Sequence, residues 1–303
     1  MLLFSFFILR FTVWDGQLLA MSLSGHISAC QRTAAGVTVV RSLQKSDVII
    51  AAGDDGNISL YSTHDLKLLQ NTPGHDDIIS SIAINLPGNE FASVGWDGIL
   101  NFWSISDFNC PVASTKAHGG NVHHVSYCHH NPSVVVTVGS DGFCRLWDSR
   151  QLQSGCSLMI NMNQSISCCN FGSGFGVNST VVGLIDGDVA LIDWRAHEIL
   201  AQRPFHNSRV NSIRSVEDRE NNFVSASDDM TSSLSIFDVS SESQPTLTRY
   251  VTIVILIIEN SVISQNNKSN IFYHLFCILL DLFITFSFIL LISFFVCLQG
   301  CCL

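Results

Sequence analysis

Hydrophobic and polar residues alternate along short runs of the chain, and these runs recur in pairs. A β-prone run such as "EFASVG" or "SVVVTVG" precedes an Asp-Gly dipeptide, and an alternating run such as "ILNFW" or "FCRLW" follows it. Alternation with a period of two is typical of a half-buried strand, and Gly tolerates the positive φ of a tight turn. The pattern therefore predicts a series of β-hairpins.

The predicted hairpins recur at a nearly constant spacing. Their turns begin, 40 to 45 residues apart, at Asp15, Asp55, Asp97, Asp141 and Asp186, and Asp229 follows 43 residues later. Five residues after each turn Gly stands a large apolar residue: Met21, Tyr61, Trp103, Trp147 and Ile192. A period of about 40 to 45 residues with several short strands per unit is typical of a β-propeller blade.

The repeated unit also has a recognisable frame. His75 stands 28 residues before Trp103, His118 stands 29 residues before Trp147, and Trp147-Asp148 completes a Trp-Asp pair in "FCRLWDSR". With this frame the chain resembles the WD-repeat family over about residues 12–240. The resemblance implies an all-β propeller with five recognisable complete blades and one partial blade.

The same resemblance implies a buried hydrogen-bond network in two blades. The residues that match the family pattern are His75, Ser93, Asp97 and Trp103 in the third blade and His118, Thr137, Asp141 and Trp147 in the fourth. A His, a hydroxyl and an Asp also suggest a hydrolytic triad. We favour the structural role because the set recurs at the repeat period and no Gly-x-Ser-x-Gly nucleophile elbow accompanies it. The chain is therefore predicted not to be an enzyme.

Two tryptophans lie outside this frame. Trp14 and Trp96 each directly precede a turn Asp, so both are expected at the same rim of the propeller. Each ring either folds over its own hairpin or anchors a protein partner, since Trp is enriched at interface hot spots. Trp14 and Trp96 are the predicted partner-binding residues.

Charge and cysteine content restrict the other functions. With 25 acidic and 15 basic residues the chain has a net charge of −10, which disfavours direct nucleic-acid binding and suits a basic protein partner. The 11 Cys residues include no Cys-x-x-Cys pair, and the His-rich run "NVHHVSYCHHN" brings no three ligands to one strand face. No metal or other cofactor is expected, and reduced thiols favour the cytoplasm and nucleus.

Both ends of the chain differ from the middle. We expect a hydrophobic leader at 1–11, an incomplete propeller at 12–249 and a hydrophobic tail at 250–303. Residues 275–298 are apolar except for Asp281 and are long enough for a transmembrane helix. The tail is therefore either a membrane anchor behind a cytosolic propeller or translated non-coding sequence, and we favour the second reading for both ends.

Three longer segments carry a finer resemblance. The runs "GHDDIISSIAI", "KAHGGNVHHVSYCHHNPSVVVTVGSDGFCRLWDSR" and "DGDVALIDWRAHEIL" are similar to blades of the methylosome WD-repeat subunits, the propeller partners of the type II protein arginine methyltransferase. This implies a scaffold that binds a protein arginine methyltransferase and presents basic Arg/Gly-rich substrates such as histone tails and Sm proteins. The alternatives are an adaptor of a ubiquitin ligase or the nuclear pore, and a tail-anchored membrane scaffold.

Overall fold

A computed structural model of the protein describes the greater part of the chain. The described residues are 6–7, 16–21, 27–43, 46–171, 178–215, 222–229, 233–240 and 246–254. Within them the chain is built from short strands, and its helical structure is limited to the single turn η1 (Leu152–Ser154).

The strands form antiparallel sheets that follow one another along the chain. The first sheet has three strands: β1 (Phe6–Phe7), β2 (Gly16–Met21) and β3 (Ile27–Thr33). The second has four: β4 (Val37–Leu43), β5 (Val48–Gly53), β6 (Asn57–Ser62) and β7 (Leu68–Pro73). The third is made of β8 (Ile79–Ile84), β9 (Glu90–Gly95), β10 (Ile99–Ser104) and β11 (Ala113–Lys116).

Three further four-stranded sheets complete the described fold. The fourth contains β12 (Val122–Tyr127), β13 (Val134–Gly139), β14 (Phe143–Asp148) and β15 (Leu158–Asn161). The fifth contains β16 (Ile166–Phe171), β17 (Ser179–Leu184), β18 (Asp188–Asp193) and β19 (Glu198–Pro204). The sixth contains β20 (Val210–Ser215), β21 (Asn222–Ser227), β22 (Ser233–Ser240) and β23 (Thr246–Val254).

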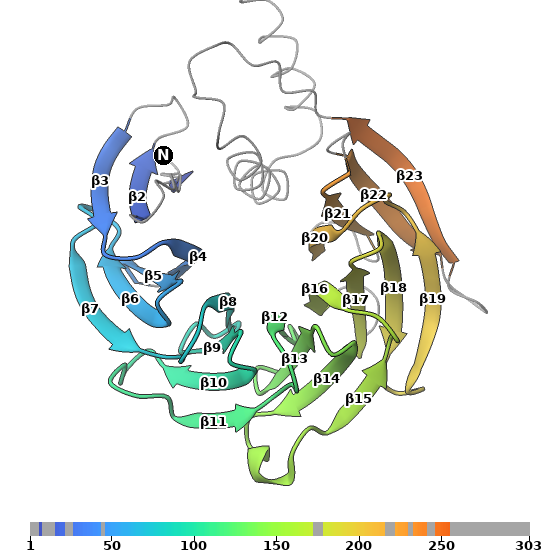
Figure 1. Ribbon diagram of the computed structural model, residues 1–303, viewed down its shortest axis with the longest axis horizontal. Coiled ribbons are helices and arrows are strands. Elements are labelled where there is room, and N and C mark those ends of the chain that lie inside the picture. The colour runs from blue at the N-terminus through green and yellow to red at the C-terminus, as the bar shows by residue number, and fades with distance from the viewer. Residues whose placement is uncertain are drawn as a thin grey trace, which may run out of the picture.

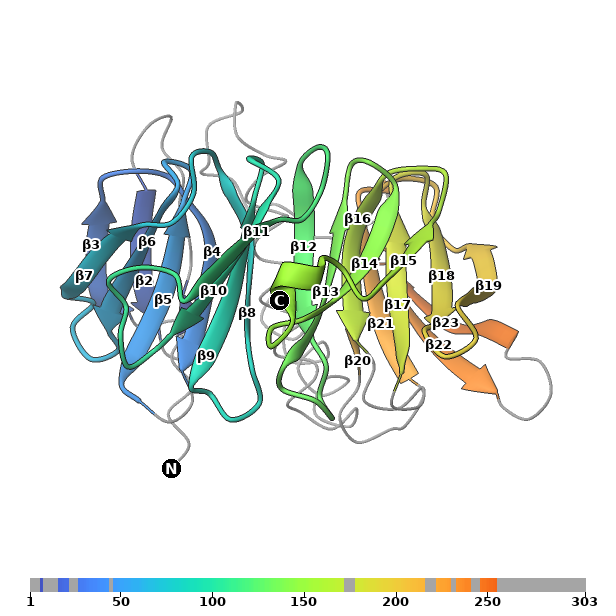
Figure 2. The ribbon, with the colours of Figure 1, turned by 90° about the horizontal axis from the view of Figure 1, so that it is seen from below.

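The sheets stand side by side around a common axis, as blades do in a propeller (Figure 1). The first strand of each four-stranded sheet lies nearest the axis and the last lies at the rim (Figure 1). Seen from the side, the strands run between two faces that are formed by the connecting turns (Figure 2). The predicted β-propeller, with five four-stranded blades and one partial blade, is confirmed.

The predicted ends fall largely outside the described residues. Strand β23 runs past the boundary expected at residue 249, because it stays paired with β22 from Thr246 to Val254. The stretch 275–298 lies outside the described residues, as does the leader apart from β1. In the part of the chain that the structure describes, no helix is long and apolar enough to cross a membrane.

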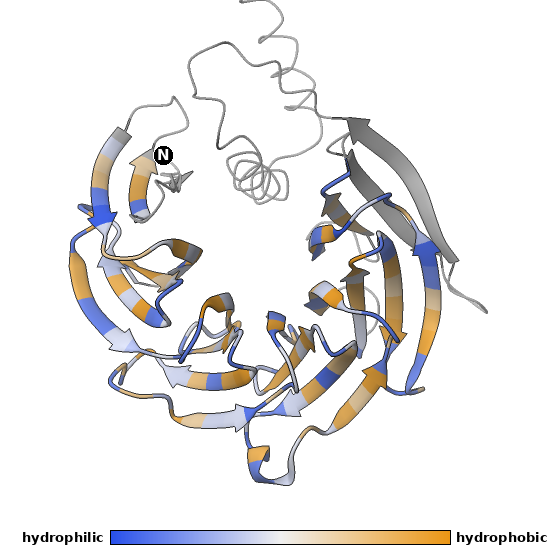
Figure 3. Cartoon of the chain, viewed as in Figure 1, coloured by the Kyte–Doolittle hydropathy of each residue, from blue (hydrophilic) through white to orange (hydrophobic). Residues whose placement is uncertain are grey.

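Apolar side chains between neighbouring blades form the core. Hydropathy follows this arrangement, with apolar residues gathered on the middle strands of the sheets (Figure 3). Between the second and third blades the Trp103 ring stacks on Phe91 at a centroid distance of 5.7 Å and also contacts Phe108 at 5.5 Å. Burial of such large apolar surfaces is the main stabilising term of the fold, so each blade depends on its neighbour.

Inner strands of neighbouring blades are also joined by hydrogen bonds from a bulge. The inner strands β4, β8 and β16 each have a register shift near the start, and the extra residue donates a hydrogen bond from its side chain to the next inner strand. Thr38 on β4 donates to the Ile79 carbonyl at 2.6 Å, Ser80 on β8 to the Val122 carbonyl, and Ser167 on β16 to the Val210 carbonyl. These bonds span 41, 42 and 43 residues, which is the repeat period.

The turn glycines hold consecutive blades close together. Gly98 has a φ of +77°, and a Cβ there would lie 2.8 Å from the His118 carbonyl oxygen at the start of the next blade. The Gly98 carbonyl in turn accepts hydrogen bonds from the backbone N–H groups of Ala117 and His118. Glycine is therefore required here both by the backbone conformation and by the close approach of the next blade.

We expect Gly98→Ala to lower the free energy of unfolding by about 2 kcal/mol or more, because it adds a steric clash to the cost of a positive φ. Gly88→Ala is the matched control, since Gly88 has a φ of +71° but nothing within 4 Å of the added Cβ. Urea unfolding of both variants measures the difference. Equal losses in the two variants would show that the close approach contributes nothing.

Candidate functional site: the blade networks and the acidic face

The four predicted residues of the third blade lie together in one chain of hydrogen bonds. His75 Nδ1 lies 2.9 Å from Asp97 Oδ2, and its Nε2 lies 2.8 Å from Ser93 Oγ. The Trp103 indole N–H donates to the same Ser93 oxygen at 2.9 Å. Because the Asp97 carboxylate can only accept, His75 donates to it from Nδ1 and accepts at Nε2. The Ser93 hydroxyl therefore donates to His75 and accepts from the indole N–H.

The fourth blade repeats this arrangement. His118 Nδ1 lies 2.8 Å from Asp141 Oδ1, its Nε2 lies 2.8 Å from Thr137 Oγ1, and the Trp147 indole N–H donates to Thr137 at 2.9 Å. Arg145 adds an ion pair with Asp141 at 2.8 Å. Every polar group in the chain of bonds has a partner, which removes the penalty of burying it.

Two later blades contain parts of the network that sequence reasoning missed. In the fifth blade the Trp194 indole N–H donates to Thr180 at 2.8 Å, from a position two residues beyond the expected apolar register at Ile192. In the sixth blade His206 lies 2.7 Å from Ser225 and 3.4 Å from Asp229. The run "LIDWR" and the histidine before β20 were the signals that could have found them.

Burial determines the charge states of the fourth-blade network. It lowers the pKa of His118 to about 4, against the opposing effect of the Asp141 carboxylate. Burial acts to raise the pKa of Asp141, but hydrogen bonds from His118 and Arg145 outweigh it and lower that pKa to about 2. At neutral pH the network therefore consists of a neutral imidazole that donates to an ionised carboxylate.

This geometry supports a structural role for the His, Ser and Asp of the third blade. The Ser93 side chain is 0% exposed and its oxygen already accepts the Trp103 N–H. A catalytic serine has to reach its substrate, whereas Ser93 lies between a histidine and an indole in the core. The hydrogen bonds among these side chains hold the turn of the third blade against its strands.

The predicted partner-binding residue Trp96 lies on the surface. Its side chain is 43% exposed in the turn between β9 and β10, and its backbone N–H donates to the Ile78 carbonyl at 2.9 Å. This bond places Trp96 beside the loop that carries Asp76 and Asp77, both exposed. Trp14 lies outside the described residues, so its role stays a prediction.

The face that carries Trp96 is acidic. Turns between the second and third strands of each blade share this face with the loops that lead into the next blade, because strand direction alternates. The exposed carboxylates in these described turns and loops belong to Asp54, Asp55, Asp76, Asp77, Asp186 and Asp228. Among the described residues the exposed cations next to them are Arg209, in the loop before β20, and Arg32, Lys116 and Arg203, at the ends of β3, β11 and β19. We call this surface the acidic face.

The histidines of "NVHHVSYCHHN" lie on β12 and in the turn that follows it. His123 occupies the bulge of β12, and His124 Nδ1 lies 3.4 Å from the thiol of buried Cys169. Burial raises the pKa of the Cys169 thiol well above its usual value, so the thiol stays protonated. Among the described residues no three metal-ligating side chains come together.

Comparison with known proteins agrees with the geometry. The family model described as "WD domain, G-beta repeat" matches residues 66–104 and 109–148, which contain the third-blade and fourth-blade tryptophans. The chain therefore contains WD repeats at 66–104 and 109–148. The methylosome protein WDR77 of Xenopus laevis is 29% identical over 124 residues, 40% of this chain and 37% of that protein.

Other relatives match shorter parts. The histone-binding protein MSI1 of Saccharomyces cerevisiae is 32% identical over 108 residues, 34% of this chain and 26% of that protein. The WD-40 repeat-containing protein MSI4 of Arabidopsis thaliana is 33% identical over 81 residues, 26% of this chain and 16% of that protein. The matched part spans little more than a third of WDR77 and less of the others.

The hydroxyl of the network is expected to contribute to the stability of the propeller. Thr137→Val keeps the shape of the side chain but leaves His118 and Trp147 each short of a partner, so the free energy of unfolding should fall by about 1 to 3 kcal/mol. Thr115→Val on the partly exposed strand β11 is the matched control and should change stability by less than about 0.5 kcal/mol. Guanidinium unfolding compares the two, and a neutral Thr137→Val would contradict a stabilising network.

The low pKa of His118 predicts a loss of stability in acid. In the unfolded chain a histidine has a pKa near 6.5, so protons bind the unfolded state first as the pH falls. Stability from the neutral imidazole is thus complete above about pH 6.5 and is lost progressively towards pH 4, and Asp141 adds a further loss below about pH 3.8.

Urea unfolding of the wild-type protein and of His118→Gln between pH 7 and pH 4.5 measures this effect. The variant should be less stable at pH 7 but should lose less of its stability on acidification. Exposed His64 provides the control, because His64→Gln should follow the wild-type pH dependence. A His118→Gln curve parallel to that of the wild type would exclude His118 as the group responsible.

Proposed function

We propose that this WD-repeat protein is a non-catalytic scaffold that binds a protein arginine methyltransferase and presents basic Arg/Gly-rich substrates to it. The observation that carries the proposal is the exposed Trp96 ring on a face with six exposed aspartates. The His, Ser and Asp side chains of the networks are buried and hydrogen-bonded to one another, so the function is expected at the surface of the propeller. This surface suits a protein partner.

Relatives of the chain support the chemistry of the partners. One is named a methylosome protein and another a histone-binding protein, and histone tails are rich in Lys and Arg. A net charge of −10 attracts such segments over a long range, with an attraction that weakens as salt is added. Histone tails and Sm proteins are the substrates that we propose.

Trp96 supplies what charge alone does not. An exposed indole contributes a large rigid surface to an interface and can also stack on an arginine side chain. Asp76 and Asp77 lie in the loop whose Ile78 carbonyl accepts the Trp96 backbone N–H, and their charges would attract a cationic segment to this part of the face. Trp14, which directly precedes Asp15 in the sequence as Trp96 precedes Asp97, is the second residue that we propose for contact with the methyltransferase.

The proposed place of action is the cytoplasm and nucleus, where arginine methyltransferases and their basic substrates meet. The alternatives are an adaptor of a ubiquitin ligase or the nuclear pore, and a scaffold anchored in a membrane by 275–298. Identification of the proteins that co-purify with the chain distinguishes these alternatives.

We expect the full-length tagged protein to co-purify with an arginine methyltransferase at low salt. Trp96→Ala should reduce the recovered methyltransferase by about tenfold, because truncation of a central aromatic anchor costs about 1 to 2 kcal/mol or more. Trp14→Ala should act in the same direction. Recovery is measured by quantitative mass spectrometry of the captured material.

Leu86→Ala is the matched control for these variants. Leu86 is 70% exposed in the turn between β8 and β9, which lies at the opposite end of strand β9 from Trp96. Its replacement removes exposed apolar surface from the other face and should leave recovery unchanged. The proposal fails if no methyltransferase is recovered, or if a ubiquitin ligase or nuclear-pore complex is recovered instead.

A further inference from the structure

The second blade keeps one member of the network and replaces the others. Asp55 occupies its turn as Asp97 does in the third blade, but Ala51 stands at the Ser93 position and Tyr61 at the Trp103 position. Thr33 stands 28 residues before Tyr61, as His75 stands before Trp103, and its hydroxyl donates to the Ala35 carbonyl at 2.8 Å. The second blade thus has the carboxylate of the network without its imidazole.

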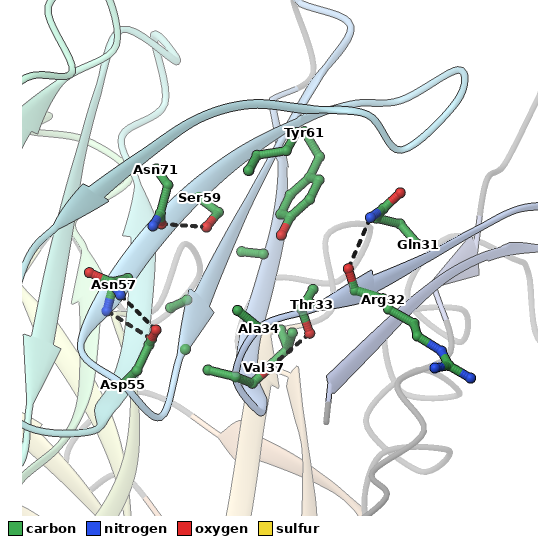
Figure 4. Close-up of a pocket in the computed structure, with 15 residues that line it drawn as sticks. Gln31, Arg32, Thr33, Ala34, Val37, Asp55, Asn57, Ser59, Tyr61 and Asn71 are labelled. Atoms are coloured by element: carbon green, nitrogen blue, oxygen red, sulfur yellow. Dashed lines mark hydrogen bonds between the residues drawn. The ribbon is translucent and has the colours of Figure 1, made fainter. Parts of the chain in front are cut away.

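A cavity occupies the place of the replaced side chains. It has a volume of about 260 Å³ and lies between the first sheet and the second blade. Thr33, Ala51, Asp55 and Tyr61 all line it, together with Ser59 and Asn71 on the adjoining strands (Figure 4). Pockets for drug-sized ligands measure roughly 300 to 1,000 Å³, so this one suits a single inserted side chain.

The lining has the chemistry of a cation site. Asp55 accepts hydrogen bonds from the backbone N–H and the side-chain amide of Asn57, at 3.1 and 2.6 Å, which fix the carboxylate in the turn. In the third blade the corresponding carboxylate is held by an imidazole N–H as well. A planar N–H donor in the cavity would supply that missing bond to Asp55.

Tyr61 adds an aromatic wall. Its side chain extends from β6 into the cavity, whereas the Arg32 guanidinium extends away from the other labelled residues (Figure 4). Burial raises the pKa of Tyr61, and the negative charge of Asp55 acts in the same direction, so the ring stays neutral beside the carboxylate. A neutral aromatic ring next to a carboxylate attracts a delocalised cation to its face.

The surroundings favour an arginine on a flexible peptide. Asp54, the residue before Asp55, is exposed and adds negative charge near the cavity, within a chain whose net charge is −10. Leu68 lines the cavity and Leu69 follows it on β7; both are exposed and offer apolar surface to a peptide backbone. A guanidinium is planar, always charged and able to bond a carboxylate with two N–H groups.

We infer that this cavity binds the guanidinium group of an arginine side chain from an Arg/Gly-rich protein segment, with Asp55 as the carboxylate partner and Tyr61 as the stacking surface. The identity of the segment rests on the proposed function. An arginine from a partner protein would thus donate to the turn Asp of the second blade, as the blade's own histidine does in the third and fourth blades.

A fluorescein-labelled peptide, Gly-Gly-Arg-Gly-Gly-Arg-Gly-Gly, tests this site by fluorescence anisotropy with the full-length protein. We expect Asp55→Asn to weaken binding about fivefold, because an ion pair next to an aromatic ring is lost. Asp54→Asn is the matched control: it removes the same charge from the neighbouring position and should weaken binding less than twofold. The same peptide with citrulline in place of arginine should bind about fivefold more weakly to the wild type only.

Rebuilding the network provides an independent test. Thr33→His combined with Ala51→Ser should fill the cavity with an imidazole that bonds Asp55, and should weaken peptide binding as much as Asp55→Asn does. Circular dichroism of each variant verifies that it is folded, and Ala51→Leu closes the cavity by a second route if the double variant does not fold. Peptide binding that survives closure of the cavity would overturn the proposal, as would equal effects of Asp54→Asn and Asp55→Asn or no binding to the wild type.

Failure of this proposal is distinguishable from failure of the proposed function. If methyltransferase recovery depends on Trp96 but Asp55→Asn leaves peptide binding unchanged, only the proposed arginine site in the cavity is wrong. If Asp55→Asn weakens peptide binding but no methyltransferase is recovered, the arginine site stands and the proposed methyltransferase partner is wrong.

Discussion

The side-chain hydrogen bond from the bulge of one inner strand to the next inner strand is the constraint on which the propeller depends. Thr38, Ser80 and Ser167 each reach a carbonyl one repeat further along the chain. Each of these bonds fixes one inner strand against the next, and the turn Gly of one blade lies close to the first residues of the next blade. These polar contacts near the axis align the blades, and the apolar surfaces that the blades bury between them supply most of the stability.

The repeated network constrains the turn Asp of a blade but leaves the residue before that Asp free to vary. The turn Asp is held from several sides in the third and fourth blades, whereas the residue directly before it lies outside the network. That preceding position holds Asp54, Trp96, Ser140, Ile185 and Asp228 in successive blades, and all five are exposed. Variation at this position changes the surface without a cost in the core, which is why it can carry recognition.

The repeat period was enough to predict the hairpins, the propeller and the distinction between Trp103 and Trp96, because all three depend on spacing alone. Spacing did not find Trp194, since its indole reaches Thr180 from two residues beyond the expected register. Nor did it predict the bulges, because alternation of apolar residues is unchanged by one extra residue near the axis. The role of Trp96 is not a matter of spacing at all: its exposure is observed, and what contacts it depends on a partner.

In our proposal the second blade uses for binding the same architecture that stabilises the third and fourth blades. Where His, Ser and Trp are present, the space between turn and strands is filled and its polar groups are satisfied. Where Thr33, Ala51 and Tyr61 replace them, the same backbone leaves a cavity beside the Asp55 carboxylate. The second blade lacks the stabilising contacts of the network there, and a ligand can occupy the space. Asp54 and Trp96 occupy equivalent turns of adjacent blades on the acidic face, so the cavity and the exposed indole lie one blade apart. A flexible segment with several arginines can engage both, and two weak contacts on one chain then bind more tightly than either alone.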